Sequence, residues 1–523
     1  MRFHCKALVA AVALAGAASA QAQIYTVSLS GNSEIPAITT NGSGTAIVTL
    51  NSTTHEMRVK AEFSNLTGTT TASHIHCCAV QPANAGVATT TPTFAGFPLG
   101  VTAGRFDATY DMRQASSWNA AFITANGNTP ASAETALLAG VTAGSAYLNI
   151  HSTFATGGEI RGTLTLFKFT TGAAPTVASV AGALDSLGAG TGVVNERLVT
   201  MAMLEPATRT QAMTALQPLS GASLSALTAN TLFLDYDQIG NRLGGLRPND
   251  AASGLWLRYA KHGGKQELST RNAKTDTDGW DVTAGYDFRI GGDTLLGLAL
   301  GYAQDDLTYA RGMAGSSGNI DGWRATAYAE QTLGNVFLDG MISLARHNSD
   351  AIRNTGMGSL ANSQTNGDQW GARLAAGWNT DLGSNLSLTP QVRLDWSKLD
   401  LDAYNESGGG GLALNVASQS LDRLRASVGG QLDWAWSATI KPYVRAFWGY
   451  EFKDGEVTTS ATFATGGSPF TVTDQGPGSS AYTLGLGINV LQTNTFSAAV
   501  SFDHSNNDDY KHNMLQVKAY WRF

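Results

Sequence analysis

The chain has 523 residues, of which only 14% are charged and 59 are glycine, and its formal net charge is −7. This length exceeds that of one ordinary domain core, so two or more domains are expected. The composition disfavours long helices and suits strands joined by turns. The negative charge, without any Lys/Arg cluster, argues against nucleic-acid binding.

The first predicted element is an export signal at residues 1–22. A charged start and a short apolar run precede small residues, the pattern of a Sec signal peptide. The run is too short to anchor the chain in a bilayer. We expect passage through the Sec machinery and cleavage near Ala20 or Ala22. Because no other apolar run reaches the length of a transmembrane helix, the exported protein is expected to be soluble or a β-barrel.

Residues 24–168 are predicted to form strands. GTAIVTLNSTTHEMRVKAEFSNL (44–66) holds two β-rich runs around a Ser/Thr turn, and SAYLNIHSTF (145–154) and GEIRGTLTLFKF (158–169) add two more. These patterns predict a small antiparallel β-sandwich or β-barrel.

This segment also carries candidate metal ligands, which are His74, His76, His151 and Glu159. His74 and His76 share one face of a strand because they are two residues apart. Imidazole, with a nearby carboxylate or thiolate, is a ligand set for Zn or Cu. The sequence does not show that these strands are neighbours. A hydrogen-bonded polar cluster that ties strands together explains the same residues.

Two cysteines, Cys77 and Cys78, remain after removal of the signal peptide, too few for a disulfide scaffold. They could bind metal, form a ring between neighbours or stay as thiols. No Ser/His/Asp order and no phosphate-binding glycine loop stands out. We therefore predict no catalytic residue and favour a protein that is not an enzyme, while a metal-dependent hydrolase or an oxidoreductase in this N-terminal segment is the alternative with least support.

Residues 169–219 are rich in Ala, Gly and Thr at their start and are predicted to be a linker with short helices. Apolar positions then recur at helical spacing as far as the glycine pair 244–245. This predicts one long helix within 220–250.

Residues 251–523 repeat one pattern of paired, alternating strands. In QWGARLAAGWN (369–379), Trp370, Leu374 and Trp378 alternate with polar residues. About twelve such runs, each of roughly ten to fourteen residues, predict an all-β domain, a twelve-stranded antiparallel transmembrane β-barrel. The polar positions should face a wet lumen, and the charges expected there are Arg373, Arg393, Asp395 and Arg425.

The last predicted strand alternates up to the final residue of MLQVKAYWRF. It should close the barrel by pairing with the first strand, because an unpaired edge in lipid leaves backbone groups unsatisfied. We expect the barrel-assembly machinery to read this strand by β-augmentation. The residues expected to form the signal are Tyr520, Trp521, Arg522 and Phe523.

Several motifs of the C-terminal half occur in a known order. They are the helix before the barrel, GWDVTAGYDF (279–288), YNESG (404–408), LDRLRASVGGQL (421–432) and the terminal YWRF. Residues from about 225 to 523 thereby resemble the translocator domain of the autotransporters of Gram-negative bacteria. The resemblance implies an outer-membrane barrel whose lumen is threaded by a helix, with an exported passenger before it. It also implies outer-membrane lipid, periplasmic chaperones and the barrel-assembly machinery as partners.

Four motifs of the N-terminal half also occur in a family's order, namely LSGNSEIPAI (29–38), SHIHCCAV (73–80), AYLNIHSTF (146–154) and GGEIRGTL (157–164). Residues 27–167 thereby resemble the CHRD domain, which implies an all-β fold and no agreed activity. The family's HIHxG pattern is interrupted here by the cysteine pair.

The two resemblances together imply an outer-membrane protein that exports its own CHRD passenger and displays it at the cell surface. The alternative is a surface adhesin that binds metal or another ligand, with the barrel serving only as an anchor.

Overall fold

The structure is a computed structural model that describes residues 22–188, 192–219, 221–246, 254–268, 273–453, 457–474, 478–490, 493, 495–507 and 509–522. The signal peptide up to residue 21, including Ala20, and the terminal Phe523 lie outside the described residues. Ala22 lies directly before the first strand. The chain forms two compact units, residues 1–171 with 187–203 and residues 172–186 with 204–523.

The N-terminal unit is built on one antiparallel sheet of eight strands that curls as a half-barrel. The strand order is β4-β6-β7-β1-β2-β3-β5, and β8 pairs with β1. The strands are β1 (Gln23–Ser30), β2 (Ser43–Asn51), β3 (Glu56–Ser64), β4 (Thr70–His76), β5 (Gly104–Asp111), β6 (Tyr147–Ser152), β7 (Ile160–Thr163) and β8 (Thr165–Leu166).

Helices of the N-terminal unit cover part of this sheet, a feature that the strand-only expectation for residues 24–168 did not include. They are α1 (Ala120–Ala125), α2 (Pro130–Thr142) and the single turns η1 (Gly31–Ser33) and η2 (Ala115–Ser117). The helix α4 (Gly192–Met203), which also belongs to this unit, lies in the segment 169–219, where short helices were expected. At the start of α2, Thr129 accepts a hydrogen bond from the Ser132 backbone, and Pro130 occupies the first turn. This cap and proline are local helix-start signals. Leu137 and Val141 of α2 join one continuous core with Val48 and Ile150 of the sheet.

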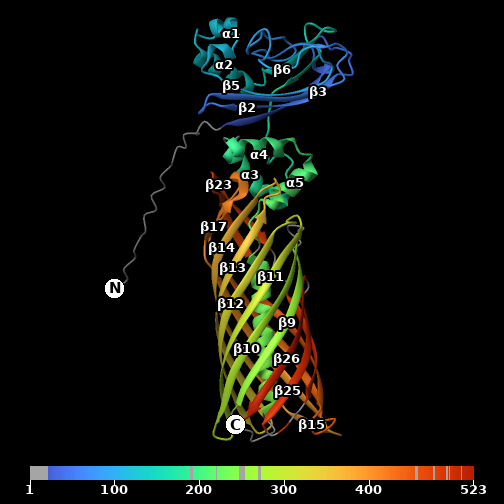
Figure 1. Ribbon diagram of the computed structural model, residues 1–523, viewed down its shortest axis with the longest axis vertical. Helices are drawn as coiled ribbons and strands as arrows, with labels where there is room; N and C mark the ends of the chain where they lie inside the picture. Colours follow the sequence, from blue (N-terminus) through green and yellow to red (C-terminus); the bar gives the residue numbers. More distant parts are fainter. Residues whose placement is uncertain are drawn as a thin grey trace, which may run out of the picture. The chain divides into compact units, whose positions relative to one another are not determined.

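The C-terminal unit is a closed antiparallel barrel of twelve long strands, as the alternation predicted. Figure 1 shows the tilted strands as a cylinder around a helix. The strands are β9 (Gly254–Leu268), β10 (Ala273–Ile290), β11 (Thr294–Arg311), β12 (Ser317–Leu333), β13 (Val336–Asn354), β14 (Leu360–Trp378), β16 (Leu386–Leu401), β20 (Gln419–Trp434), β21 (Lys441–Lys453), β24 (Ser480–Val490), β25 (Phe496–Asn507) and β26 (Tyr510–Arg522).

Four barrel strands, β21, β24, β25 and β26, have the expected length of 11 to 13 residues, whereas the other eight are longer, and β13 and β14 each reach 19 residues. At about 3.3 Å per residue and a tilt of about 45°, such a strand rises more than 40 Å. The hydrocarbon core of a bilayer is about 30 Å thick, so these strands extend beyond it.

Each strand presents an apolar face outward and a polar face inward. In β14, Trp370, Leu374 and Trp378 are exposed, whereas Arg373 is buried. The barrel closes where β26 pairs with β9, from Tyr510 opposite Gln266 to Arg522 opposite Gly254. No sheet edge is therefore left open to lipid along this seam.

The two ends of the barrel differ. At one end the strands are joined by short turns, such as residues 291–293 between β10 and β11. At the other end, residues 402–418 and 454–479 link barrel strands and carry further structure. That structure comprises β17 (Tyr404–Asn405), β18 (Ser407–Gly408), η4 (Gly409–Gly411), β19 (Leu414–Val416), β22 (Val457–Phe463) and β23 (Gly466–Asp474), while the short β15 (Thr380–Gly383) lies at the turn end.

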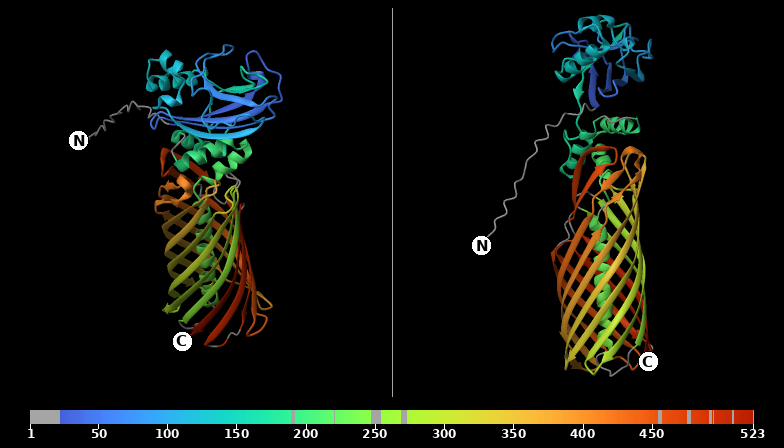
Figure 2. Two further views of the ribbon diagram at one scale, coloured as in Figure 1. Left: turned by 45° about the horizontal axis from the view of Figure 1, so that its top comes forward. Right: turned by 90° about the vertical axis from the view of Figure 1, so that its left-hand side faces the viewer.

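A 26-residue helix, α6 (Gly221–Leu246), runs inside the barrel, and both views of Figure 2 show it within the cylinder. Three shorter elements precede it in this unit, η3 (Pro175–Val177), most of α3 (Ala178–Leu187) and α5 (Pro206–Ala215). Among the described residues, none of the helices combines the length and the hydropathy of a membrane span. Nearly all described side chains of α6 are buried, on every face of the helix, which is typical of a helix enclosed by protein.

Contacts fix the direction of α6. Leu224 and Leu227, near its start, pack with Leu307 and Leu401 next to the long loops. The last turns of α6 pack instead with a cluster at the short-turn end, made of Trp256, Leu295, Tyr328 and Met341. The chain therefore enters the lumen at the long-loop end.

Candidate functional site

Asp237 of α6 lies at the centre of a buried group of charges inside the barrel. Its carboxylate accepts hydrogen bonds from Arg373 at 2.6 Å and from Arg393 at 2.9 Å, and Arg445 lies 3.9 Å away. Arg373 also donates from Nη2 to Asp395 Oδ2 at 2.9 Å. Because each buried charge faces the opposite sign, ion pairs join the helix to the barrel wall.

Two further ion-pair groups bind α6 on either side of Asp237. Asp235 pairs with Arg258 and Arg324, and Arg242 donates to Asp287, with Nη2 and Oδ1 2.9 Å apart. Arg258 and Asp287 are not among the charges that the sequence predicts for the lumen. Both alternate with outward apolar residues on their strands, and that alternation was the signal that could have found them.

Arg425 completes the set of charges expected in the lumen. Its guanidinium donates to Glu451 at 2.6 Å and to Asn230 of α6 at 3.1 Å. A cavity of about 20 Å³ between helix and wall is lined by side chains that include Phe233 and Asp237. A cavity of this size holds about one water molecule, so the helix and the lumen side chains fill the barrel at this level.

The described part of the expected assembly signal lies on the closing strand β26. The guanidinium of Arg242 sits 4.7 Å from the ring centre of Tyr520. The ring centre of Trp521 is 5.5 Å from that of Phe496 on β25, and Arg522 donates to the Thr493 carbonyl at 2.9 Å. These residues therefore contact the lumen helix and the neighbouring strand as well as the barrel seam.

In the N-terminal unit, three of the four predicted metal ligands come together. The register of β4 and β6 places Ala72 opposite His151 and His74 opposite Asn149. His76 follows on the same face of β4, since side chains alternate along a strand. The ring nitrogens of His74, His76 and His151 lie within 4.8 Å of one another.

Each of these three rings donates one N–H to a backbone carbonyl. The donations are His74 Nε2 to Pro92 at 2.6 Å, His76 Nδ1 to Ala85 at 2.9 Å and His151 Nδ1 to Thr156 at 3.0 Å. A carbonyl only accepts, so these contacts fix which nitrogen carries the hydrogen. Burial lowers the pKa of all three imidazoles, that of His76 to about 4. The rings are therefore neutral at pH 7, and each keeps one free lone pair.

Glu159, the fourth predicted ligand, does not join the histidines. It comes directly before β7, and its buried carboxylate accepts hydrogen bonds from four donors. These donors are Thr40 Oγ1, Ser152 Oγ, and the backbone N–H groups of Thr67 and Gly68. With its oxygens engaged in this way, Glu159 ties the loop before β4 to the sheet.

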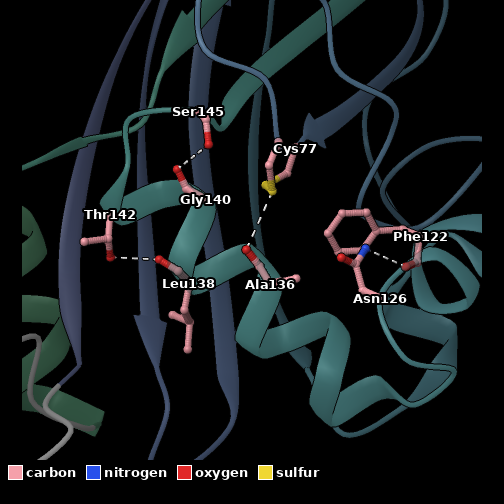
Figure 3. Close-up of a disulfide and its surroundings, with 9 residues drawn as sticks. Cys77, Phe122, Asn126, Ala136, Leu138, Gly140, Thr142 and Ser145 are labelled. Atoms are coloured by element: carbon pink, nitrogen blue, oxygen red, sulfur yellow. Dashed lines mark hydrogen bonds between the residues drawn. A yellow bond between two sulfur atoms is a disulfide. The ribbon is translucent and has the colours of Figure 1, made fainter.

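The two cysteines follow His76 directly, but their sulfur atoms are bonded to each other and pack against α2. Cys77 and Cys78 form a disulfide against α2, where a Cβ on Gly140 would meet both sulfur atoms. Figure 3 shows this disulfide beside the carbonyl of Ala136, which lies 3.6 Å from the Cys78 sulfur. No thiolate is therefore present for a metal at this position.

A buried polar group that connects several segments of the chain lies next to the histidines. Arg161 of β7 is fully buried and donates to the Ser33 carbonyl at 2.5 Å and to Asn84 at 2.6 Å. Its guanidinium lies 4.4 Å from the ring centre of Tyr147, and the other neighbour of that ring is His76, stacked at 4.9 Å. This packing holds the His76 ring in place.

Two protein-family models match the chain. The model of the autotransporter beta-domain matches residues 255–503, and the model of the CHRD domain matches residues 25–164. Neither model describes an enzyme family.

Among curated proteins, YaiT of Escherichia coli is 27% identical over 53% of this chain and 28% of its own length. Pertactin autotransporter of Bordetella bronchiseptica is 27% identical over 44% of this chain and 26% of its own length. The chain thus spans about a quarter of the length of these relatives. Among solved structures, the translocator domain of autotransporter NalP from Neisseria meningitidis is 20% identical, with a TM-score of 0.46 over 56% of this chain and 98% of that chain.

Proposed function

Because residues 255–503 form an autotransporter β-domain and residues 25–164 form a CHRD domain, we propose that this outer-membrane protein carries its own CHRD domain across the membrane and displays it at the cell surface. The barrel and its family place the chain in the outer membrane of a Gram-negative bacterium. Display of the CHRD domain is the step that the proposal adds.

The direction of α6 supports this proposal above all. The chain enters the lumen at the end that carries the long loops, and in outer-membrane barrels the long loops are extracellular. The residues before α6 follow the same direction, since the Ala215 carbonyl at the end of α5 accepts a hydrogen bond from Arg353 at 2.9 Å. Arg353 lies at the long-loop end of β13. This direction supports an exit of the segment that leads to the CHRD domain on the outer side of the barrel.

The barrel also has the surfaces that insertion requires. Its outward face is apolar and its seam is closed by backbone hydrogen bonds. Delivery would use the Sec machinery, periplasmic chaperones and the barrel-assembly machinery, which would recognise β26.

Protease treatment of intact cells tests the proposal. We expect added protease to remove the CHRD domain and to leave a membrane-protected fragment that begins near residue 204 or later. A periplasmic marker protein must stay intact in the same cells. If the CHRD domain resists protease in intact cells and is cleaved only after the outer membrane is opened, the proposal is wrong.

A chain without residues 520–523 provides the matched control. The deletion removes the last three register pairs between β26 and β9 that the structure describes, from Tyr520–Trp256 to Arg522–Gly254. We expect loss of both the protected fragment and the surface exposure of the CHRD domain. Surface exposure that survives this deletion would mean that export does not depend on the closed barrel.

A further inference from the structure

The three histidines of the N-terminal unit leave lone pairs aimed at one another. His74 Nδ1 lies 3.4 Å from His151 Nε2, and both rings use their other nitrogen to donate to a carbonyl. His76 Nε2 is buried and has no hydrogen-bond partner among the residues that the structure describes. Buried polar atoms of native proteins are nearly always paired, so three converging lone pairs need an explanation.

We propose that His74 Nδ1, His76 Nε2 and His151 Nε2 bind one transition-metal ion, with Cu²⁺ preferred and Zn²⁺ as the weaker competitor. A cation between the three nitrogens turns mutually repelling lone pairs into ligands. Two imidazoles bound at about 2.05 Å to a tetrahedral ion have nitrogens roughly 3.4 Å apart. The separation of His74 Nδ1 and His151 Nε2 has this value, so these two nitrogens can bind one ion, and the preference for Cu²⁺ over Zn²⁺ rests on the order of affinities and not on this spacing.

The donor set decides the class of metal. The cluster offers neutral imidazoles, while the nearby carboxylate of Glu159 and the sulfur atoms of Cys77 and Cys78 are engaged elsewhere. Imidazole nitrogen suits Cu and Zn, whereas Ca²⁺, Mg²⁺ and Mn²⁺ prefer oxygen ligands. Affinity at such a site rises from the earlier divalent ions to Cu²⁺ and falls again at Zn²⁺.

The surroundings also suit a metal centre. Each ring is oriented by a hydrogen bond from its non-ligating nitrogen to a carbonyl, the usual arrangement around metal-bound histidines. His76 is further held by stacking on Tyr147. His74 and His76 are buried, but His151 is partly exposed, so an ion and a fourth ligand from solvent can approach from its side.

The test uses the full chain in detergent micelles, stripped of metal with a chelator. Titration with Cu²⁺ should give one bound ion per chain, with nitrogen couplings in the electron paramagnetic resonance spectrum. Zn²⁺ should displace Cu²⁺ only in large excess. Less than about one fifth of an ion per chain, or a spectrum without nitrogen couplings, would overturn the proposal. The binding needs only purified protein, so it does not depend on surface display.

Variants locate the site. His74→Gln, His76→Gln and His151→Gln keep an N–H donor for the backbone carbonyl and remove the ligand lone pair. Each should weaken Cu²⁺ binding by more than about 100-fold, since even changes in groups that only orient metal ligands cost 10- to 100-fold. Protease resistance of the CHRD domain shows whether a variant is folded. If His74→Gln or His76→Gln fails this test, the conclusion rests on His151→Gln, whose side chain is partly exposed.

The matched control is His55→Asn. His55 lies in the same unit but pairs with Glu134 of α2 at 2.8 Å, away from the cluster. Its φ of 59° is a conformation that asparagine also tolerates. This variant should bind Cu²⁺ as the wild type does. If His55→Asn loses binding while the three cluster variants keep it, the proposed site is wrong.

Discussion

Asp237 Oδ1 of the lumen helix accepts a hydrogen bond from Arg373 Nη1 of the barrel wall at 2.6 Å. The same oxygen accepts from Arg393, so one carboxylate of α6 neutralises guanidinium groups from two neighbouring strands. The helix is thereby fixed in the lumen by charge as well as by shape.

The first prediction concerns the ability of α6 to close the barrel. Asp237→Asn leaves buried arginines without their counter-ion, which should weaken the association of helix and barrel by about 3–5 kcal/mol. We expect more frequent open events in planar-bilayer conductance recordings. Asp278→Asn is the control, because Asp278 is exposed and its ion-pair partner in the described part of the chain is the exposed Lys261. Equal conductance of both variants would show that Asp237 does not hold the helix.

The second prediction concerns the lipid-facing surface. Leu374 is 65% exposed and lies midway along β14 between the exposed Trp370 and Trp378, which we expect to mark the two membrane interfaces. Leu374→Arg should therefore lower the free energy of unfolding in lipid vesicles by about 2–4 kcal/mol, as expected for a charge near the bilayer midplane.

The control for this change is Leu333→Arg. Leu333 is 59% exposed but ends β12 beside a turn, so the expected loss is about 0–1 kcal/mol. Urea unfolding followed by heat-modifiable gel migration measures both. A loss at Leu333 equal to that at Leu374 would contradict the assigned membrane depth.

The third prediction concerns Glu159 as a structural carboxylate. Burial alone would raise the pKa of Glu159, but hydrogen bonds, among them those from Ser152 and Thr40, hold it below the ordinary value of 4.5. Glu159→Gln places an amide N–H₂ against these donors. We expect the free energy of unfolding of the CHRD domain at pH 7 to fall by about 2–3 kcal/mol.

The pH dependence of this effect has a definite sign. A carboxylate whose folded pKa is depressed contributes stability above its unfolded pKa, and this contribution is lost as the pH falls through the folded pKa. The difference between Glu159→Gln and wild type should therefore shrink below pH 4.5. Pulse proteolysis of the full chain measures it, with the exposed Glu62→Gln as the control that should stay within about 0.5 kcal/mol. A pH-independent difference would contradict the role of the ionised carboxylate.

The fourth prediction follows from the proposed metal centre. Free Cu²⁺ at 100 times its dissociation constant should stabilise the CHRD domain by about 2.7 kcal/mol, because the ion binds only the folded state. A chelator should abolish this gain, and the heat-modifiable migration of the barrel should not change. If Cu²⁺ still stabilised the CHRD domain of the His151→Gln variant, the stabilisation would not come from the histidine cluster.

The barrel could be predicted because the alternation of apolar and polar residues is visible within each strand of the sequence. In residues 369–379 the alternation alone assigns Trp370 and Leu374 to lipid and Arg373 to the lumen, and the structure places them there. The helix over 221–246 likewise follows from apolar residues at helical spacing. Its charge partners do not, because Arg258 and Arg324 meet Asp235 only after the sheet has closed.

The candidate metal site could likewise be predicted only as far as it depends on neighbouring residues of the sequence. The face shared by His74 and His76 follows from their spacing, but the approach of His151 depends on β4 pairing with β6. That pairing joins strands separated by about 75 residues, by β5 and by two helices. Glu159 is close in sequence to His151, and this proximity alone suggests a shared site. In the structure β7 begins only at Ile160, and the preceding turn directs the carboxylate to Thr67 and Gly68 instead.

The threading of α6 through the barrel has a mechanical consequence. A pull on the CHRD domain, from flow or from an adhering surface, would act along the helix axis. The ion pairs of Asp235, Asp237 and Arg242 are spread along that axis, so they would share the load in shear instead of breaking one after another. The barrel would then hold α6 in place under load, and the outer membrane would carry the force.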